Sequence, residues 1–237
     1  MKTRAVTIGI PAYNEEANIA MLVKSIFMQK RHDWTLKKVL IVLDGSEDTT
    51  PQIARKLQKE HKQIEVIFGK TRKGKSYRMN QILQHSDSEF LLFLDADIKL
   101  GNMLAVTKMV RTFAHRPHIL VAAAYQNPIP SDTLIGKINT TSFKVWYKLI
   151  STYRNGNNIN CLMGSATMLR KSFYAEFRFP PLVVCDQHYL YMSVIKKNRH
   201  SFCLVRGTNV LFHMVSTFKD SRLLGARSIY QDKMDLE

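Results

Sequence analysis

Short apolar segments alternate with amphipathic ones through the first half of the chain, and this alternation limits the fold more than any other feature of the sequence. The apolar segments are rich in Val, Ile, Leu and Phe and have the length of strands. Strands that are apolar throughout and are separated by helices are typical of a mostly parallel sheet covered by helices on both faces. We therefore expect an α/β fold with strands at Val6–Ile10, Val39–Leu43, Ile64–Phe68, Phe90–Leu94 and Leu120–Ala124.

Helices are expected between these strands, and two of them carry start signals. Asn14 is placed to cap a helix whose apolar residues begin at Ile19, and Thr50 precedes Pro51, a residue that favours the first helical position. After Pro130 the pattern becomes mixed. There we expect a long helix from about Leu134 to Arg154, a loop at 155–160, short strands at Ala166–Leu169 and Phe202–Val205, and a helix at Asp186–Lys197.

The chain is strongly basic, with 35 Lys and Arg against 19 Asp and Glu and a formal net charge of +16. This balance favours a polyanionic partner, which is nucleic acid, anionic lipid or a phosphate-bearing substrate. The three cysteines, Cys161, Cys185 and Cys203, form no close pair, which predicts a reducing compartment. Acidic residues follow the N-terminus too soon for a secretory signal, and no apolar run approaches the roughly 18 residues that span a bilayer. We expect a cytoplasmic protein, soluble or peripheral on the inner face of the cell membrane.

Polar residues gather where three of the predicted strands end. The strands are followed by Pro11–Ala12–Tyr13–Asn14, by Asp44–Gly45–Ser46 and by Asp95–Ala96–Asp97. In a parallel sheet these ends share one edge, which is where ligands bind. Clustered carboxylates suit a hard cation such as Mg²⁺ or Mn²⁺, which usually binds the phosphates of a substrate as well. The alternative for Asp95 and Asp97 is a solvated turn without a ligand.

A second phosphate signal lies between the third strand and the next helix. Residues 69–76, GKTRKGKS, match the phosphate-loop pattern G-x-x-x-x-G-K-[ST] and predict a nucleoside triphosphatase as a rival function. Such loops usually follow the first strand, and this reading leaves the other strand ends unexplained. The remaining alternatives are a flexible basic loop that meets a diphosphate, with Lys70, Arg72, Lys73, Lys75 and Arg78, or a solvated basic turn.

Four segments in the first half resemble the nucleotide-binding half of the family 2 glycosyltransferases, which have the GT-A fold. These segments are VTIGIPAYNEEANI (6–19), IVLDGSEDTT (41–50), GKSYRMNQIL (74–83) and FLLFLDADI (90–98). The resemblance implies a single GT-A catalytic domain over 1–237. A nucleotide-sugar-binding half would cover 1–98, an acceptor-binding half 99–215 and a C-terminal tail 216–237.

The resemblance also implies roles for the residues at the strand ends. Asp95 and Asp97 would form a D-x-D motif, with Asp97 on a divalent cation (Mn²⁺ or Mg²⁺) and Asp95 near the metal or the ribose. A UDP- or GDP-sugar would be bound by residues of these segments, namely Pro11, Ala12, Tyr13, Asn14, Glu15, Asp44, Lys75, Asp95 and Ala96. The family often has a second acidic residue before Asp44, where this chain has Leu43.

The resemblance is weaker in the second half. Asp186 matches the family's general base, although Cys185 replaces the usual acidic neighbour, and a helix N-cap is the alternative for Asp186. His213 falls where relatives place a His on the metal or the diphosphate, or else it is a packed structural residue. In the tail only Arg227 matches the motif of processive members, which argues against polymerisation. Residues 156–164 and the helix before them should shape the acceptor side.

The long predicted helix carries Lys137, Lys144, Lys148 and Arg154 among Phe143, Trp146 and Tyr147. It either rests on an anionic bilayer or packs on the sheet as an ordinary amphipathic helix. Together, the sequence favours an inverting, metal-dependent glycosyltransferase with a glycan or lipid-linked acceptor at an anionic membrane surface. The rivals are the triphosphatase and a non-enzymatic nucleic-acid-binding module, and the acidic strand ends argue against nucleic acid.

Overall fold

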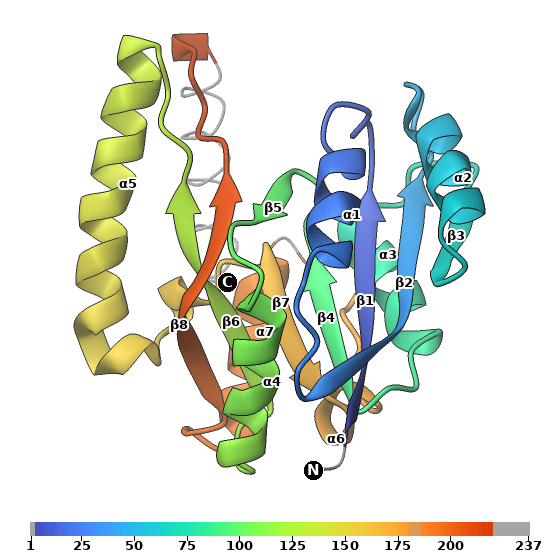
Figure 1. The fold of residues 1–237 in the computed structure, drawn as a ribbon. Helices are drawn as coiled ribbons and strands as arrows, with labels where there is room; N and C mark the ends of the chain where they lie inside the picture. Colours follow the sequence, from blue (N-terminus) through green and yellow to red (C-terminus); the bar gives the residue numbers. More distant parts are fainter. Residues whose placement is uncertain (1–2, 182, 184, 220–237) are drawn as a thin grey trace.

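The fold is described from a computed structural model in which residues 3–181, 183 and 185–219 are described (Figure 1). The strands and helices expected up to Ala124 are all present. In the first half they are β1 (Arg4–Ala12), α1 (Ile19–Phe27), β2 (Trp34–Asp44), α2 (Thr50–Glu60), β3 (Ile64–Gly69), α3 (Lys75–Gln84), β4 (Phe90–Leu94), β5 (Ile98–Leu100), α4 (Ala105–His115) and β6 (Val121–Pro128). Of these, only the three-residue β5 was not anticipated, because it is too short to show a period.

The second half follows the expected order, although both strands are longer than predicted and the long helix ends about two residues earlier. It contains α5 (Leu134–Thr152), the 3₁₀ turns η1 (Tyr153–Gly156) and η2 (Ile159–Cys161), β7 (Ala166–Arg170), α6 (Lys171–Tyr174), α7 (Asp186–Lys197) and β8 (Phe202–Phe212). Arg227, the one tail residue that matches the motif of processive members, lies outside the described residues. Across the described part, no helix combines the length and apolarity that a bilayer crossing requires.

All eight strands form one sheet in the order β3-β2-β1-β4-β7-β6-β8-β5. The strands β3, β2, β1 and β4 pair in parallel, as the alternation predicted. The fifth predicted strand, β6, does not continue this parallel series, because β7 lies antiparallel between it and β4. The sheet is therefore mostly parallel with an antiparallel insertion, and β7 joins the two halves of the chain.

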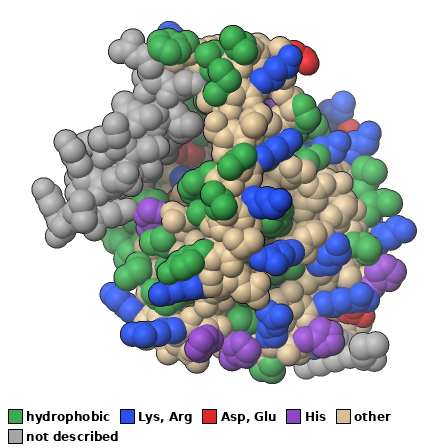
Figure 2. Space-filling view, turned by 90° about the vertical axis from the view of Figure 1, so that its left-hand side faces the viewer, with side chains coloured by type: hydrophobic (Ala, Val, Ile, Leu, Met, Phe, Trp, Pro, Cys, Tyr) green, Lys and Arg blue, Asp and Glu red, His purple; other side chains and the backbone are tan. Residues whose placement is uncertain are grey.

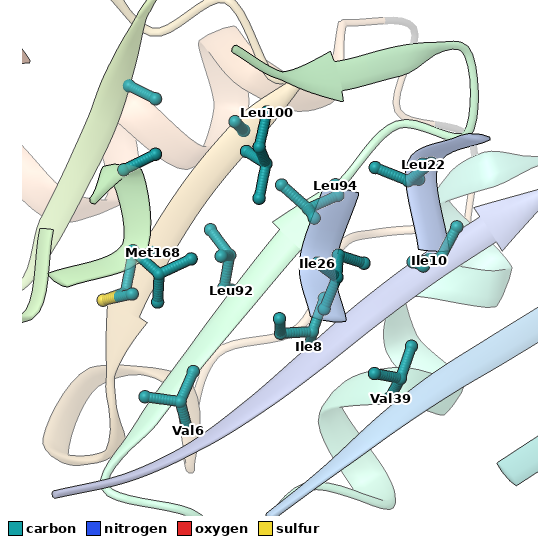
Figure 3. Close-up of a cluster of buried hydrophobic side chains, with 14 of the residues drawn as sticks. Val6, Ile8, Ile10, Leu22, Ile26, Val39, Leu92, Leu94, Leu100 and Met168 are labelled. Atoms are coloured by element: carbon teal, nitrogen blue, oxygen red, sulfur yellow. The ribbon is translucent and has the colours of Figure 1, made fainter. Parts of the chain in front are cut away.

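Side chains of successive strand residues enter two cores on opposite faces of the sheet. In β4, Phe90, Leu92 and Leu94 join the core beneath α1, α2 and α4, whereas Leu91 and Phe93 join the core beneath α3, α6 and α7. Figure 3 shows part of the first core, in which Leu92 and Leu94 lie beside Ile8 and Ile26. Burial on both faces explains why these strands are apolar throughout.

The two predicted helix starts differ from the structure. Asn14 does not cap α1, which begins at Ile19 without a side-chain cap, because Asn14 turns the chain with φ of 54°. The helix α2 begins at Thr50 rather than after it, and Thr50 Oγ1 accepts a hydrogen bond from the Glu15 N–H instead. The side chains of both residues connect the loop after β1 to the segment from the end of β2 to the start of α2, and neither caps a helix.

Candidate active site

The carboxyl ends of β1, β2 and β4 meet at one edge of the sheet, as the sequence predicted. Ala12 lies opposite Leu43, and Gly9 lies opposite Phe93, so the loops that follow emerge side by side. Pro11 and Ala12 are the last residues of β1, and Ala96 is buried within the D-x-D segment. The edge thus collects the segments predicted to bind a nucleotide sugar.

The loop after β1 is held by the loop after β2 through reciprocal hydrogen bonds. The Asn14 N–H donates to Ser46 Oγ (3.1 Å), and the Glu47 N–H donates to Asn14 Oδ1 (2.9 Å). Asn is among the residues that adopt the left-handed conformation seen here most readily. Asn14 therefore fixes the shape of the edge through its backbone as well as its side chain.

Asp44 lies buried at the end of β2 and accepts hydrogen bonds from the connection between β3 and α3. We call residues 70–74 the basic loop. The Lys73 N–H (2.7 Å) and Arg78 Nε (2.7 Å) donate to Asp44 Oδ1, and the Gly74 N–H (2.9 Å) donates to Oδ2. The resemblance implied that Asp44 binds the nucleotide sugar. In the structure its carboxylate anchors the basic loop, and Arg78, expected near a diphosphate, is buried beside it.

The basic loop also packs on the loops after β1 and β2. Gly45 has φ of 71°, and a Cβ added there would lie 2.7 Å from the Arg72 backbone nitrogen. Only glycine permits such a close approach at this conformation. The Arg72 guanidinium lies over the Tyr13 ring, 4.1 Å from its centroid. Such a cation–π contact leaves an aromatic and a planar cation side by side at the edge of the sheet.

Lys75 brings together the two acidic residues that the resemblance assigned to different halves of the site. Its Nζ lies 2.7 Å from Asp95 Oδ1 and 3.3 Å from Asp186 Oδ2. Burial opposes the charge of Lys75, but the attraction of these two carboxylates prevails and raises the pKa of the ammonium group above its usual value. The D-x-D segment and the first turn of α7 therefore both contact the ammonium group of Lys75.

Asp186 is the first residue of α7, and Cys185 occupies the cap position. Its Oδ1 accepts a hydrogen bond from the Gln187 N–H (3.0 Å), while Oδ2 faces Lys75. The predicted alternative of an N-cap for Asp186 is therefore wrong, because Asp186 is the first residue of the helix and the residue before it is the cap. The Asp186 carboxylate, in the first turn of α7, faces Lys75.

A group of acidic side chains surrounds Asp97. Desolvation raises the pKa of the Asp97 carboxyl above its ordinary value, and the charge of Asp95 raises it further, while His213 acts in the opposite direction. Desolvation also raises the pKa of Glu15, to which Asp97 and Asp95 add. These carboxylates disfavour one another's charge, so a cation at this position would relieve the repulsion. The chemistry of the group fits the Mn²⁺ or Mg²⁺ that the sequence predicted.

The protein itself offers few ligands for such a cation. Among the described residues, no three His, Cys, Asp or Glu side chains converge as a metal site would require. Mg²⁺ commonly binds through one or two carboxylates and completes its shell with phosphate oxygens and water. Asp97 and Asp95 match that pattern, in which the substrate brings the remaining ligands.

The segment just before β7 also reaches this edge. The sequence analysis did not assign any residue of that segment to the site. Ser165 O accepts a hydrogen bond from the Asp95 N–H (2.9 Å), and a Cβ at Gly164 would lie 3.2 Å from Gln187 Oε1. Gly164 ends the 156–164 stretch expected to shape the acceptor side. The pairing of β7 with β4 brings Ser165 here, and Gln187 comes with the first turn of α7, beside the predicted Asp186.

Residues 7–177 match the model of the glycosyl transferase family 2. The chain belongs to this family. Its geometry agrees with the match, because three of the segments that resemble the family end at one edge of the sheet, and Lys75 from the fourth reaches Asp95 there.

Two named relatives of the chain are glycosyltransferases whose names give different substrates. The chain is 27% identical to a 4,4'-diaponeurosporenoate glycosyltransferase of Staphylococcus haemolyticus over 73% of this chain and 46% of the relative. It is 26% identical to the UDP-Glc:alpha-D-GlcNAc-diphosphoundecaprenol beta-1,3-glucosyltransferase WfgD of Escherichia coli, over 83% of this chain and 72% of that protein. The chain therefore spans less than half of the staphylococcal relative.

Solved structures support the GT-A fold of the glycosyltransferase. The mannosyltransferase PcManGT of Pyrobaculum calidifontis, solved with GDP-Man and Mn²⁺, superposes with a TM-score of 0.75 at 16% identity. The match covers 94% of this chain and 60% of that one. This confirms the fold expected from the sequence.

The nucleoside triphosphatase predicted from GKTRKGKS is not supported in this glycosyltransferase. A phosphate loop directs free backbone N–H groups at its ligand. Here the Lys73 and Gly74 N–H groups donate to Asp44, and Lys75 faces Asp95 and Asp186. The sequence matches the motif, but the backbone N–H groups of Lys73 and Gly74 are already hydrogen-bonded to Asp44 and do not point at a phosphate.

Proposed function

We propose that this glycosyltransferase is an inverting enzyme that transfers a sugar from a UDP- or GDP-sugar to a hydroxyl group of a lipid-linked glycan. The observation that carries this proposal is the position of Lys75 between Asp95 and Asp186, at 2.7 and 3.3 Å. A donor motif and a candidate base border one space there. A transferase that joins two substrates requires such an arrangement.

On the donor side, the Tyr13–Arg72 pair and the loop around Asn14 bind the nucleoside, with Asp44 holding the basic loop in place. Asp97 and Asp95 hold a divalent cation, Mn²⁺ or Mg²⁺, with His213 nearby. A bound cation supplies neutralisation of the negative charge that develops on the departing nucleoside diphosphate. Lys75, already charged, binds an oxygen of the same diphosphate.

On the acceptor side, Asp186 takes the proton of the attacking hydroxyl group. The acceptor oxygen forms a bond to the anomeric carbon from the face opposite the diphosphate. The bond from that carbon to the phosphate oxygen breaks, and its electron pair leaves with the nucleoside diphosphate. One displacement of this kind inverts the configuration at the anomeric carbon.

The proposed acceptor places the enzyme at a membrane surface. The name of the Escherichia coli relative specifies a diphosphoundecaprenol-linked acceptor. A charge of +16 favours the anionic, cytoplasmic face of a membrane, where nucleotide sugars are also available. Peripheral association requires no membrane-spanning helix.

The substitution Asp186→Asn tests the assignment of the base. We expect donor binding, measured as a thermal shift with UDP- and GDP-sugars and Mn²⁺, to match that of the parent enzyme. Transfer to a short-chain analogue of GlcNAc-diphosphoundecaprenol should slow by about 10²–10⁴-fold, the usual contribution of general-base catalysis. An unchanged rate would place the base elsewhere or indicate a phosphate acceptor. A thermal shift with ATP or GTP alone, and none with a nucleotide sugar, would refute the donor.

The cation is tested separately through its dependence on the nucleotide. Because the described protein residues provide at most two close ligands, Mn²⁺ should bind weakly by itself and at least tenfold more tightly when UDP or GDP is present. Titration calorimetry measures both affinities. Equal affinity in the two titrations would mean that the protein holds the ion without the diphosphate.

A further inference from the structure

The helix α5 packs on the molecule with one face and presents a large apolar surface on the other. Gly136, Thr140, Tyr147 and Ser151 are buried against the body of the protein. The outward side chains are strongly exposed, which is costly for apolar groups in water. They are Leu134 (73% exposed), Ile138 (53%), Val145 (59%), Trp146 (41%), Leu149 (66%) and, just beyond the helix, Tyr153 (60%).

Positive charge accompanies these apolar side chains along the whole helix. Lys137, Lys144 and Lys148 are exposed, and α5 contains no acidic residue. With 19 residues the helix extends over roughly 28 Å. Figure 2 shows this side of the molecule, on which hydrophobic and basic side chains are interspersed and acidic ones are scarce. We call this surface the α5 face.

Two basic hollows adjoin the α5 face. One, of about 260 Å³, is lined by Lys148 and Arg206 together with Tyr125 and Ser151. The other, of about 430 Å³, shares Arg206 and lies between α4 and β8. It adds Lys108, Arg111, His115 and Arg116. Within the described residues, Arg111 alone among these cations has a recorded acidic partner, Asp33 (2.6 Å), so most of this charge is not neutralised by the protein.

We propose that the α5 face is the surface by which the enzyme docks on a bilayer that contains anionic lipids. The helix lies parallel to the membrane, with its exposed apolar side chains at the boundary of headgroups and acyl chains. Its lysines and the hollows around Arg206 face lipid phosphates. This inference deepens the proposed function and rests on its lipid-linked acceptor.

Charge distinguishes a bilayer from a second copy of the chain as the partner. Two α5 faces in contact would bring Lys137, Lys144 and Lys148 of each copy together, and the helix has no carboxylate to pair with them. An anionic bilayer offers both an apolar layer and negative charge. The mixed character of the α5 face matches that combination.

The position of α5 also connects the membrane to the active site. At the N-terminal end of the helix, Thr133 Oγ1 donates to Ser216 O (2.9 Å) and Asn139 Nδ2 donates to Val215 O (2.9 Å). Val215 and Ser216 lie two and three residues after His213, whose charge acts on Asp97. Docking through α5 therefore holds the catalytic edge close to the membrane surface, where a lipid-linked acceptor is presented.

Cosedimentation with vesicles tests the docking surface. The parent protein should bind phosphatidylcholine vesicles that contain about a quarter phosphatidylglycerol, and bind pure phosphatidylcholine far less. The variant K137Q/K144Q/K148Q should bind the anionic vesicles on the order of 100-fold more weakly. The control K56Q/K59Q/K62Q removes the same charge from the α2 side, across the molecule from α5 in Figure 1, and should retain most of the binding.

A second variant isolates the apolar contribution. Val145→Gln with Leu149→Gln keeps the charge and the helix propensity, and we expect at least tenfold weaker binding. In the parent protein, Trp146 fluorescence should shift to shorter wavelength on the anionic vesicles, whereas buried Trp34 should not respond.

Three results would overturn the inference. They are equal binding to neutral vesicles, an equal loss with the α2 control, or a dimer without lipid that V145Q/L149Q converts to a monomer. Thermal shifts with nucleotide sugars are measured on every variant. Normal shifts without vesicle binding would reject only the docking surface, whereas lost shifts in the parent protein would reject the proposed function.

Discussion

At the scale of single residues, Asp97 and Lys75 show how charge is arranged at the sheet edge before any substrate binds. Desolvation and the neighbouring Asp95 disfavour the ionised form of Asp97. Lys75, in contrast, is held charged between Asp95 and Asp186. The folded protein therefore keeps carboxylates that repel one another close together. The ammonium group of Lys75 pairs with Asp95 but leaves the repulsion at Asp97 in place. Such an arrangement lowers stability in the absence of a ligand and favours binding of a metal and a diphosphate.

Replacing Asp97 by Asn should abolish sugar transfer and yet raise the melting temperature of the metal-free protein at pH 7. The pKa of Asp97 is raised in the folded state, so its ionisation above that pKa reduces stability. The neutral variant avoids this loss. The difference in melting temperature should shrink as the pH falls through the raised pKa towards the ordinary value near 4, where the carboxyl is protonated in both states. Thermal unfolding in EDTA at several pH values measures the effect.

Asp33 provides the matched control, because its pKa is lowered in the folded protein whereas that of Asp97 is raised. Its hydrogen bond with Arg111 lowers the pKa of the Asp33 carboxyl. Asp33→Asn should therefore lower the melting temperature at pH 7, and the difference should vanish as the pH falls through the lowered pKa. A metal-free Asp97→Asn variant that melts below the parent protein, or that retains activity, would contradict the role assigned to Asp97.

At the scale of elements, local periodicity was enough to predict every strand and helix of the first half except β5, because each repeats its pattern over several residues. It could not predict that β7 lies between β4 and β6, since that pairing joins residues more than 70 positions apart. For the same reason Ser165 was not anticipated at the edge. The predicted helix-capping role of Asn14 was wrong. Its left-handed backbone supports a contact between two loops, which a helical pattern of apolar residues does not reveal. Asp44, Asp95 and Asp97 were predictable at the edge because they end or closely follow strands.

Asp44 anchors the basic loop through three hydrogen bonds, and Asp44→Asn should weaken this anchor. The side chains of Asp44 and Arg78 are 6% and 4% exposed, so the substitution leaves a buried guanidinium without its carboxylate. We expect a loss of about 3 kcal/mol, at the low end for a broken buried pair, because Arg78 keeps Gln81 Oε1 and Thr71 O as acceptors. Urea unfolding measures the loss. Donor affinity should also fall.

A double-mutant cycle separates the ion pair from other effects of this change. Adding Arg78→Met to Asp44→Asn removes the unpaired charge, so the double variant should be no less stable than Asp44→Asn alone. Additive losses would show that Asp44 and Arg78 do not act as a pair.

At the scale of the whole molecule, one sheet runs through both halves of the chain. The parallel strands β1 to β4 and the strands β6 and β8 are joined by β7, and each face of the sheet carries a continuous core. The boundary near residue 98 that the sequence predicted therefore falls within one structural unit. We expect that unit to unfold in one step.

The two tryptophans allow this expectation to be tested, because Trp34 lies in β2 and Trp146 in α5. In the variants Trp146→Phe and Trp34→Phe, fluorescence follows one half at a time, while far-UV circular dichroism follows the whole chain. The urea midpoints of the two signals should coincide within each variant. Trp34→Phe should be less stable overall, since Trp34 Nε1 donates to Thr107 Oγ1 (3.0 Å) within the core. Separate midpoints within one variant would indicate two independent domains.

The place of β7 in the sheet has a consequence for synthesis on the ribosome. The strand β4 has an apolar side chain at every position, and one of its edges pairs with β7, which is made about 70 residues later. At a usual rate of roughly 5–20 residues per second, that edge stays open for on the order of 4–15 s. An open apolar strand edge is a site at which nascent chains associate with one another. The yield of native enzyme in a cell therefore depends on how fast residues 95–165 are translated as well as on the stability of the finished sheet.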